Sequence, residues 1–289
     1  METVKTIRVF NGATAIVTGS ASGIGRAIAE ELARRGCEVI LADRQVEVAE
    51  EVAAQIHSFG GKALASEVDV RDFSVVQQLV QETVKRTGRL DYIFNNAGIT
   101  LTGNVSHYDI EDWKLILDVN LCGVINGIQA AYKVMENQGF GHIVNTSSMA
   151  GFFPTPGDVG YTTTKHAIFG LSKALRAEVA HRGIRVSVLC PGAVHTPAFE
   201  RKGKYGKMLM NLSPEQQQRM VAMLMQGSKP ISPDTFAKKA LDLVAKNKAI
   251  VMVPSSVNLF RLFECLFPSF TLSFIQKSFR TMQEQLGTE

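Results

Sequence analysis

Short apolar runs alternate with amphipathic stretches along most of this chain. The first runs are ATAIVTG at 13–19, EVILAD at 38–43 and KALASEVDV at 62–70, and residues 24–35 and 45–59 between them repeat apolar side chains at helical spacing. A period of 3.6 residues is typical of a helix, whereas a short continuous apolar run bounded by turns is typical of a buried strand. The pattern therefore predicts that the chain begins β-α-β-α-β.

The same alternation continues to about residue 254. Further strands are predicted at DYIFNNAG, HIVNTSS, RVSVLCPG and AIVMVP, and further helices at about 73–87, 111–137, 161–180 and 236–245. Strands that are apolar on both faces belong in a parallel sheet whose two sides are covered by helices. We therefore expect an α/β fold with a doubly wound parallel sheet flanked by helices.

Composition narrows the class of protein. The chain has 289 residues, of which 45% are hydrophobic and 20% charged, as in ordinary globular proteins. A net charge of +4 is too weak to favour nucleic-acid binding. The four cysteines form no C-x-x-C pair, so neither a metal site nor a disulfide framework is expected. The amino terminus has no apolar segment typical of a secretory signal, and we expect a cytoplasmic protein.

A glycine-rich turn follows the first predicted strand. TGSASGIG at 18–25 places Gly19, Gly23 and Gly25 between that strand and an amphipathic helix. Glycines let the backbone approach a pyrophosphate closely, and the helix amino terminus offers N–H groups and a favourable dipole. Because glycines also end strands for structural reasons, the turn alone is weak evidence for a phosphate site.

An acidic residue strengthens this interpretation. The second strand ends at Asp43, where a dinucleotide-binding fold places a carboxylate that accepts hydrogen bonds from the adenosine ribose. A carboxylate there would repel a 2′-phosphate, which favours NAD over NADP. Arg44 complicates this inference, because an arginine can turn toward a phosphate. The alternative for Asp43 is a solvated acid at a strand end.

A tyrosine and a lysine stand four residues apart in GYTTTKHAIFG. This spacing puts Tyr161 and Lys165 on one face of a helix. An unperturbed phenol titrates near pH 10, and a nearby ammonium group favours the phenolate. The pair therefore has the chemistry of a general acid/base, although roughly 0.3 such pairs are expected in this chain by chance, so the pair alone proves little.

Five motifs together resemble the short-chain dehydrogenase/reductase family, in its compact single-domain branch. They occur in the family's order: TGSASGIG at 18–25, NNAG at 95–98, Asn120 in LDVNLCG, Ser148 followed by Tyr161 and Lys165, and PGAVHTP at 191–197. The match spans roughly residues 12–254. It implies a Rossmann-type fold and an NAD-dependent oxidoreductase acting on CH–OH groups without a metal.

The resemblance also implies the roles of the catalytic residues. Tyr161 would be the general acid/base, and Lys165 would hold the nicotinamide ribose and lower the pKa of the phenol. Ser148 would hydrogen-bond the substrate oxygen, while Ser147 would face the other way because neighbouring side chains alternate along a strand. Asn120 would anchor a water that connects Lys165 to solvent.

The cofactor contacts implied by the family are spread over the whole sheet. Asp69 and Val70 would meet the adenine, and Val194 with Thr196 would fix the carboxamide. The full set comprises Gly19, Ser22, Gly23, Ile24, Gly25, Asp43, Arg44, Asp69, Val70, Asn96, Ala97, Gly98, Tyr161, Lys165, Pro191, Gly192, Val194 and Thr196, with Asn95 beside them.

Two regions fall outside these motifs. The variable substrate loop would lie at about 198–232 and holds five of the ten methionines, Met208, Met210, Met220, Met223 and Met225. They would line an adaptable apolar pocket, or belong to a short helix near 214–225 that merely packs on the body. Accordingly, residues 1–254 are predicted to form the catalytic domain and 255–289 an apolar extension.

The extension carries six phenylalanines between 260 and 279. Arg261, Glu264 and Pro268 interrupt it, so it does not resemble a membrane span. It would be a helical cover over the substrate site, a surface buried in an oligomer, or an element lying on a membrane.

The favoured function is hydride transfer between NAD(H) and a secondary alcohol or ketone, an apolar molecule similar to a steroid or lipid. We expect a homodimer or homotetramer, no nucleic-acid partner, and peripheral membrane contact through 255–280 as an option. One alternative is a non-catalytic NAD-binding sensor that recruits a partner through the Phe-rich tail. Another is a sugar-nucleotide epimerase or dehydratase, which normally needs a larger substrate domain than this chain offers.

Overall fold

The protein is built on a seven-stranded parallel sheet. The computed structural model describes residues 6–197, 205–225 and 229–287, without the side chains of 221, 224 and 225. The strands follow the order β3-β2-β1-β4-β6-β7-β9, and every neighbouring pair is parallel. Their bounds are β1 Thr14–Thr18, β2 Glu38–Asp43, β3 Lys62–Glu67, β4 Tyr92–Asn95, β6 Gly141–Thr146, β7 Ile184–Pro191 and β9 Ile250–Val253.

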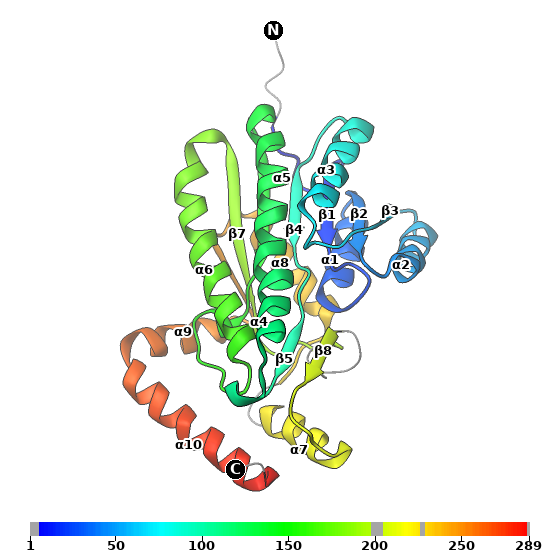
Figure 1. Cartoon of the computed structure of the whole chain (residues 1–289). Coiled ribbons are helices and arrows are strands. Elements are labelled where there is room, and N and C mark those ends of the chain that lie inside the picture. The colour runs from blue at the N-terminus through cyan, green and yellow to red at the C-terminus, as the bar shows by residue number, and fades with distance from the viewer. Residues whose placement is uncertain (1–5, 198–204, 226–228, 288–289) are drawn as a thin grey trace.

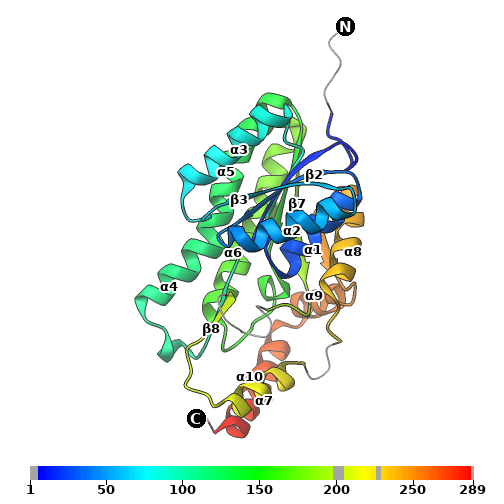
Figure 2. The ribbon, with the colours of Figure 1, turned by 90° about the vertical axis from the view of Figure 1, so that its right-hand side faces the viewer.

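Helices cover both faces of the sheet (Figures 1 and 2). One apolar core joins the sheet to α1, α2 and α8, and a second joins it to α3, α5 and α6. The helices are α1 Gly23–Arg34, α2 Val46–Ser58, α3 Phe73–Thr87, α4 Ile110–Leu117, α5 Gly123–Gln138, α6 Val159–Val179, α7 Pro214–Met225, α8 Pro233–Ala245, α9 Val257–Leu266 and α10 Pro268–Leu286.

The strand order positions the site. From β1 the chain builds outward through β2 to β3, and then crosses back to place β4 on the other side of β1. At such a switch point the loops after two neighbouring strands diverge, and a crevice opens beyond their carboxyl ends. The TGSASGIG turn follows β1 and NNAG includes the end of β4, so both motifs lie at this crevice.

The predicted fold class is confirmed, with instructive differences in detail. β3 is an edge strand rather than a buried one, and Leu64 is 49% exposed. The single helix expected at 111–137 is α4 and α5 joined by a π-helical turn, Asp118–Cys122. A small sheet of β5 Thr100–Thr102 and β8 Gly206–Met208 was not predicted, because three-residue strands are too short to show a period.

The continuous helical stretch Ile110–Gln138 is long and apolar enough to cross a membrane. Half of its most apolar window is buried, however, and α5 packs against α3 and β6. The stretch is therefore packed as a core helix against the sheet.

The chain after β9 forms two helices at one end of the molecule. In Figure 1, α9 and α10 extend beyond the body, and α10 returns beside α7. Leu212, Met220 and Leu286 form a buried cluster where these elements meet. The tail is thereby attached to the second half of the predicted substrate loop.

Candidate active site

The glycine turn after β1 is packed at backbone contact distance. Gly19 has a φ of 67°, and a Cβ on it would lie 2.8 Å from the Cα of Ala97. A Cβ on Gly25 would lie 2.1 Å from the carbonyl oxygen of Gly19. Any side chain at Gly25 would therefore separate α1 from the turn that precedes it.

Thr18 locks this turn to the end of β4. Its Oγ1 donates to the carbonyl of Phe94 (3.3 Å) and accepts from the backbone N–H groups of Asn96 (2.9 Å) and Ala97 (3.1 Å). Asn96 Nδ2 donates in return to the carbonyl of Thr18 at 3.1 Å. The role of Thr18 was missed in the sequence, where the signal was a polar residue closing an otherwise apolar strand.

The turn has the donors that a phosphate group requires. Ser22 is the N-cap of α1, yet within the described residues its side chain makes no capping hydrogen bond, so the first N–H groups of the helix lack a side-chain acceptor. The Ser20 hydroxyl oxygen is buried in the same turn with no hydrogen-bond partner among the residues described. A bound pyrophosphate would satisfy such donors, and Gly23 and Ile24 are the first two residues of the helix.

Asp43 faces the glycine turn from the end of β2. Its Oδ2 accepts from the backbone N–H of Ala21 at 2.9 Å, and its Oδ1 accepts from that of Gln45 at 3.0 Å. A half-buried carboxylate held by two backbone donors keeps a fixed orientation and retains lone pairs for ribose hydroxyls. The residues present therefore fit a dinucleotide at both its pyrophosphate and its ribose.

Arg44 is exposed and lies close to Asp69. Its side chain is 64% exposed, and its Nε lies 3.6 Å from Asp69 Oδ2. Arg71 holds the same carboxylate through Nε (3.0 Å) and Nη2 (2.6 Å), and this hydrogen bonding lowers the pKa of Asp69. Val70 beside it is buried. Asp69 is thus an ionised residue with two arginine neighbours, next to the predicted adenine position.

Lys165 is buried in the interior of the site. Its Nζ donates to the carbonyl of Thr146 at 2.9 Å and lies 5.3 Å from the centroid of the Tyr161 ring. The side chain of Tyr161 is half-buried, whereas Lys165 is only 4% exposed. Burial lowers the pKa of Lys165 to about 8. The structure therefore brings the predicted catalytic pair together on α6.

Asn120 occupies the π-helical turn between α4 and α5. Its Oδ1 accepts from the N–H of Ile99 (2.8 Å), and its Nδ2 donates to the carbonyl of Ile99 (2.9 Å) and to Thr164 Oγ1 (3.3 Å). Such single π-turns within helices are frequent at functional sites. A Cβ on Gly98 would lie 3.3 Å from Asn120 Oδ1 and 3.6 Å from Lys165 Nζ, so both groups converge on this glycine.

The two serines after β6 have different environments. Ser147 is buried, and its Oγ donates to the backbone carbonyl of Lys165 at 2.7 Å. Ser148 is half-buried, and its Oγ accepts from the N–H of Ala150 at 3.2 Å. Ser147 thus fixes α6 against the sheet, whereas the more exposed Ser148 remains the predicted substrate-binding serine.

The PGAVHTP segment reaches the glycine turn from the other half of the sheet. Gly192 follows Pro191 at the end of β7, and its N–H donates to the carbonyl of Val253 at 2.9 Å. Val194 pairs with Ile231 in an isolated bridge. A Cβ on Gly23 would lie 3.3 Å from Thr196 Cγ2, which places the predicted carboxamide segment beside the predicted phosphate turn.

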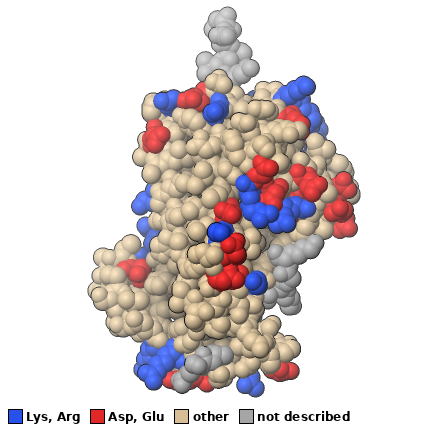
Figure 3. Space-filling view, viewed as in Figure 1, with Lys and Arg blue, Asp and Glu red and all other residues tan. Residues whose placement is uncertain are grey.

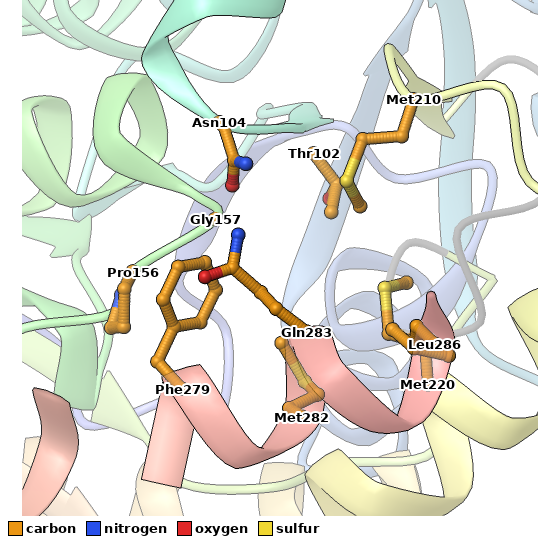
Figure 4. A pocket seen from close by; sticks show the side chains of 10 residues that line it. All are labelled: Thr102, Asn104, Pro156, Gly157, Met210, Met220, Phe279, Met282, Gln283 and Leu286. Carbon is orange, nitrogen blue, oxygen red and sulfur yellow. The ribbon is translucent and has the colours of Figure 1, made fainter. Parts of the chain in front are cut away.

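A mostly apolar pocket lies beside the amino end of α6 (Figure 4). Met210 and Met220 line it from the substrate loop, and α10 contributes Phe279, Met282 and Leu286. Its free space is about 10 Å³, which is room for roughly one water molecule. In this conformation α7 and α10 nearly fill the pocket.

The other three of the five methionines predicted to line an apolar pocket do not contribute to the pocket lining that the structure describes. Met208 and Met223 pack against the buried cluster next to the pocket rather than lining it. The side chain of Met225 and residues 198–204 and 226–228 of the predicted substrate loop lie outside the described residues.

Comparison with known proteins identifies the family. The family model for short chain dehydrogenase matches residues 13–205. The oxidoreductase UcpA of Salmonella typhimurium is 40% identical over 192 residues, which cover 66% of this chain and 73% of that protein. The 2,5-dichloro-2,5-cyclohexadiene-1,4-diol dehydrogenase LinX of Sphingobium indicum is 38% identical over 186 residues, covering 64% and 74%.

A solved structure extends the likeness beyond the family match. The short chain dehydrogenase/reductase of Burkholderia phymatum in complex with NAD is 25% identical, with a TM-score of 0.81 over 91% of this chain and 96% of that one. The family match covers the glycine turn and the Tyr161–Lys165 pair. The chain belongs to the short-chain dehydrogenase family and is an oxidoreductase of CH–OH groups on a nucleotide-binding Rossmann fold.

Proposed function

We propose that this enzyme transfers hydride between NAD(H) and an apolar secondary alcohol or ketone, with Tyr161 as the proton carrier. The observation that carries the proposal is the buried Lys165 ammonium group, 5.3 Å from the Tyr161 ring centroid. A cation held there in a low dielectric favours the phenolate far more than a solvated cation would.

The residues of the chain then divide the work. In the oxidative direction Tyr161 takes the hydroxyl proton, and Ser148 orients the substrate oxygen by a hydrogen bond. Lys165 has a pKa of about 8, so at neutral pH it is mainly charged. Thr146 and Asn120 fix the positions of Lys165 and the segment beside Gly98. The nicotinamide, when bound, supplies the hydride acceptor or donor.

A preference for NAD over NADP is supported by Asp43. Its carboxylate is held at the glycine turn, where a 2′-phosphate would meet a negative charge, and Arg44 is directed toward Asp69 instead. The likeness to solved structures supports binding of a nicotinamide dinucleotide but does not favour NAD over NADP. The Burkholderia phymatum structure holds NAD, and a putative gluconate 5-dehydrogenase from Beutenbergia cavernae, 29% identical with a TM-score of 0.72, holds NADP at low occupancy.

An apolar substrate is supported by the pocket at the amino end of α6. Met210, Met220, Phe279 and Met282 offer flexible, polarizable surface there. Because the free space is so small, a substrate of steroid or lipid size would have to displace α7 or α10. We propose that these helices form the adjustable wall of the substrate site.

The experiment is a paired assay of wild-type protein and Tyr161→Phe. Secondary alcohols and ketones graded by size and polarity are supplied with NAD(H) or NADP(H), and absorbance of the reduced nicotinamide is followed. We expect turnover with NAD(H) that increases with apolar size, and a loss of roughly 10²–10⁴-fold in the variant with NADH binding retained. Unchanged turnover in Tyr161→Phe contradicts the proposal.

We further propose a cytoplasmic enzyme that forms a homodimer or homotetramer. Sedimentation velocity of the purified protein measures the assembly, and a monomer at all concentrations contradicts that part.

A further inference from the structure

The outer face of α9 and of the first turns of α10 is unusually apolar. Each of its large side chains is at least two-fifths exposed: Leu259, Phe260, Leu262, Phe263, Leu266, Phe267, Phe270, Leu272 and Phe274. We call these nine residues the tail face. In Figure 3 the bulge at the lower left, where α9 meets α10, is mostly uncharged, with an acidic patch on it. Soluble monomers rarely expose an apolar patch of this extent without a partner for it.

The charge distribution of the tail face is the first argument about its partner. Between 259 and 276 the charged residues are Arg261 and Glu264, both half-buried, and Arg261 Nε and Glu264 Oε2 are withdrawn from solvent. Exposed positive charge begins immediately afterwards, at Lys277 and Arg280. Arg280 pairs with Glu284 at 3.0 Å, whereas Lys277 has no ion pair among the described residues.

The geometry of α10 is the second argument. Its inner face carries Thr271 and Ile275, which are buried, while Phe270 and Phe274 are 64% and 63% exposed. At about 100° per residue, Lys277 continues the stripe of Phe270 and Phe274. The stripe thus changes from apolar to cationic within one turn, in the order in which a membrane changes from acyl chains to headgroups.

The position of Leu272 favours a membrane over a protein as the partner of the tail face. It is 48% exposed and lies roughly 200° around the helix from Phe270, so this end of the hairpin is apolar on opposite sides. A flat protein surface covers one side of a helix, whereas acyl chains can pack around a hairpin end that inserts between them.

We propose that the tail face inserts into the acyl-chain boundary of an anionic phospholipid bilayer, with Lys277 among the headgroups. The site of attachment would be the same helix that closes the apolar pocket through Phe279, Met282 and Leu286. The proposal concerns attachment alone and holds whatever the enzyme's substrate is.

The test is co-sedimentation of the full-length protein with vesicles, without substrate or cofactor. One set of vesicles contains phosphatidylcholine only, and the other also contains phosphatidylglycerol. We expect binding to the mixed vesicles and weaker binding to pure phosphatidylcholine. The double variant Phe270→Ser, Phe274→Ser should bind roughly tenfold more weakly to both, because it removes two well-exposed aromatic side chains. Lys277→Gln should lose about fivefold on anionic vesicles only.

The matched control is Leu64→Ser, Phe73→Ser, which removes exposed apolar side chains from β3 and α3. It should bind as wild type does. NADH binding by each variant reports an intact fold, so failed attachment is distinguished from failed enzymology. Equal binding by the tail-face variant and wild type overturns the proposal, as does wild-type protein that stays in the supernatant. A particle mass that halves when Phe270 and Phe274 are replaced, measured by sedimentation velocity without lipid, also overturns it by assigning the face to a second copy.

Discussion

The burial of Lys165 predicts how the free energy of unfolding changes with pH, which can be measured without an activity assay. The side chain is 4% exposed, and burial lowers its pKa from 10.5 to about 8. At 1.36 kcal/mol per unit, the ammonium group costs the folded state about 3 kcal/mol at neutral pH. The cost is present below pH 8, where the lysine is charged in both folded and unfolded chains.

The sign of the pH dependence follows from proton binding. Between pH 8 and 10.5 the unfolded chain keeps the proton on this lysine and the folded chain releases it. The free energy of unfolding therefore rises with pH in this window. Between pH 7 and pH 9.5 the gain from Lys165 alone is about 2 kcal/mol.

The variant Lys165→Met removes this contribution and keeps most of the packing volume. We expect the free energy of unfolding of wild type, relative to the variant, to rise by about 2 kcal/mol from pH 7 to pH 9.5. Urea unfolding at the two pH values measures the difference. The unpaired Thr146 carbonyl in the variant costs a similar amount at both, so it cancels. The variant should also lose turnover.

Lys173→Met is the matched control, since Lys173 is exposed on the same helix. Its pH dependence should match that of wild type. If the stabilities of wild type and Lys165→Met change with pH in parallel, Lys165 is not a charged group shielded from water. The argument for the Tyr161 phenolate then fails as well.

Three further predictions concern the cofactor turn and the core. Gly25→Ala should weaken NADH binding and cost roughly 1–3 kcal/mol of stability, because the added Cβ would lie 2.1 Å from the Gly19 carbonyl oxygen; Gly170→Ala, on an open helix surface, should cost nothing in urea unfolding. Asp43→Ser should raise kcat/KM with NADPH relative to NADH, and an unchanged ratio contradicts the role given to its carboxylate. Burial lowers the pKa of His142 to about 3 from 6.5, so stability is lost as pH falls below 6.5, by about 2 kcal/mol at pH 5; His142→Gln should lose less over the same range.

The fold was predictable because its signals are local. The strand at 38–43 and the helix at 73–87 have the predicted bounds, since each is a complete apolar or amphipathic period closed by a turn or cap. The helix expected at 111–137 was right in extent, but its π-turn was not predictable. That turn places Asn120 against Ile99 and Thr164, both distant in sequence.

The site residues likewise divide into those whose placement the sequence predicts and those whose placement it does not. Spacing places Tyr161 and Lys165 on one helical face, and strand alternation separates Ser147 from Ser148. Thr18 could not be assigned a role, because its two N–H donors, Asn96 and Ala97, lie in the loop after β4, far from it in sequence. The fate of the Phe-rich tail was left with three interpretations, because a helical period does not say which neighbour will cover a face.

The sequence by itself determined the order of helices and strands along the chain and the position of the glycine turn, because these depend on side-chain period and residue type, and its motifs named the candidate catalytic residues. Only the tertiary structure decided how deeply Lys165 is buried and that Ser147 bonds the backbone carbonyl of Lys165. It also decided which side of the last helix closes the pocket and which remains exposed. Burial depends on neighbours brought together from distant parts of the chain, and burial sets both the pKa of Lys165 and the exposure of the tail face.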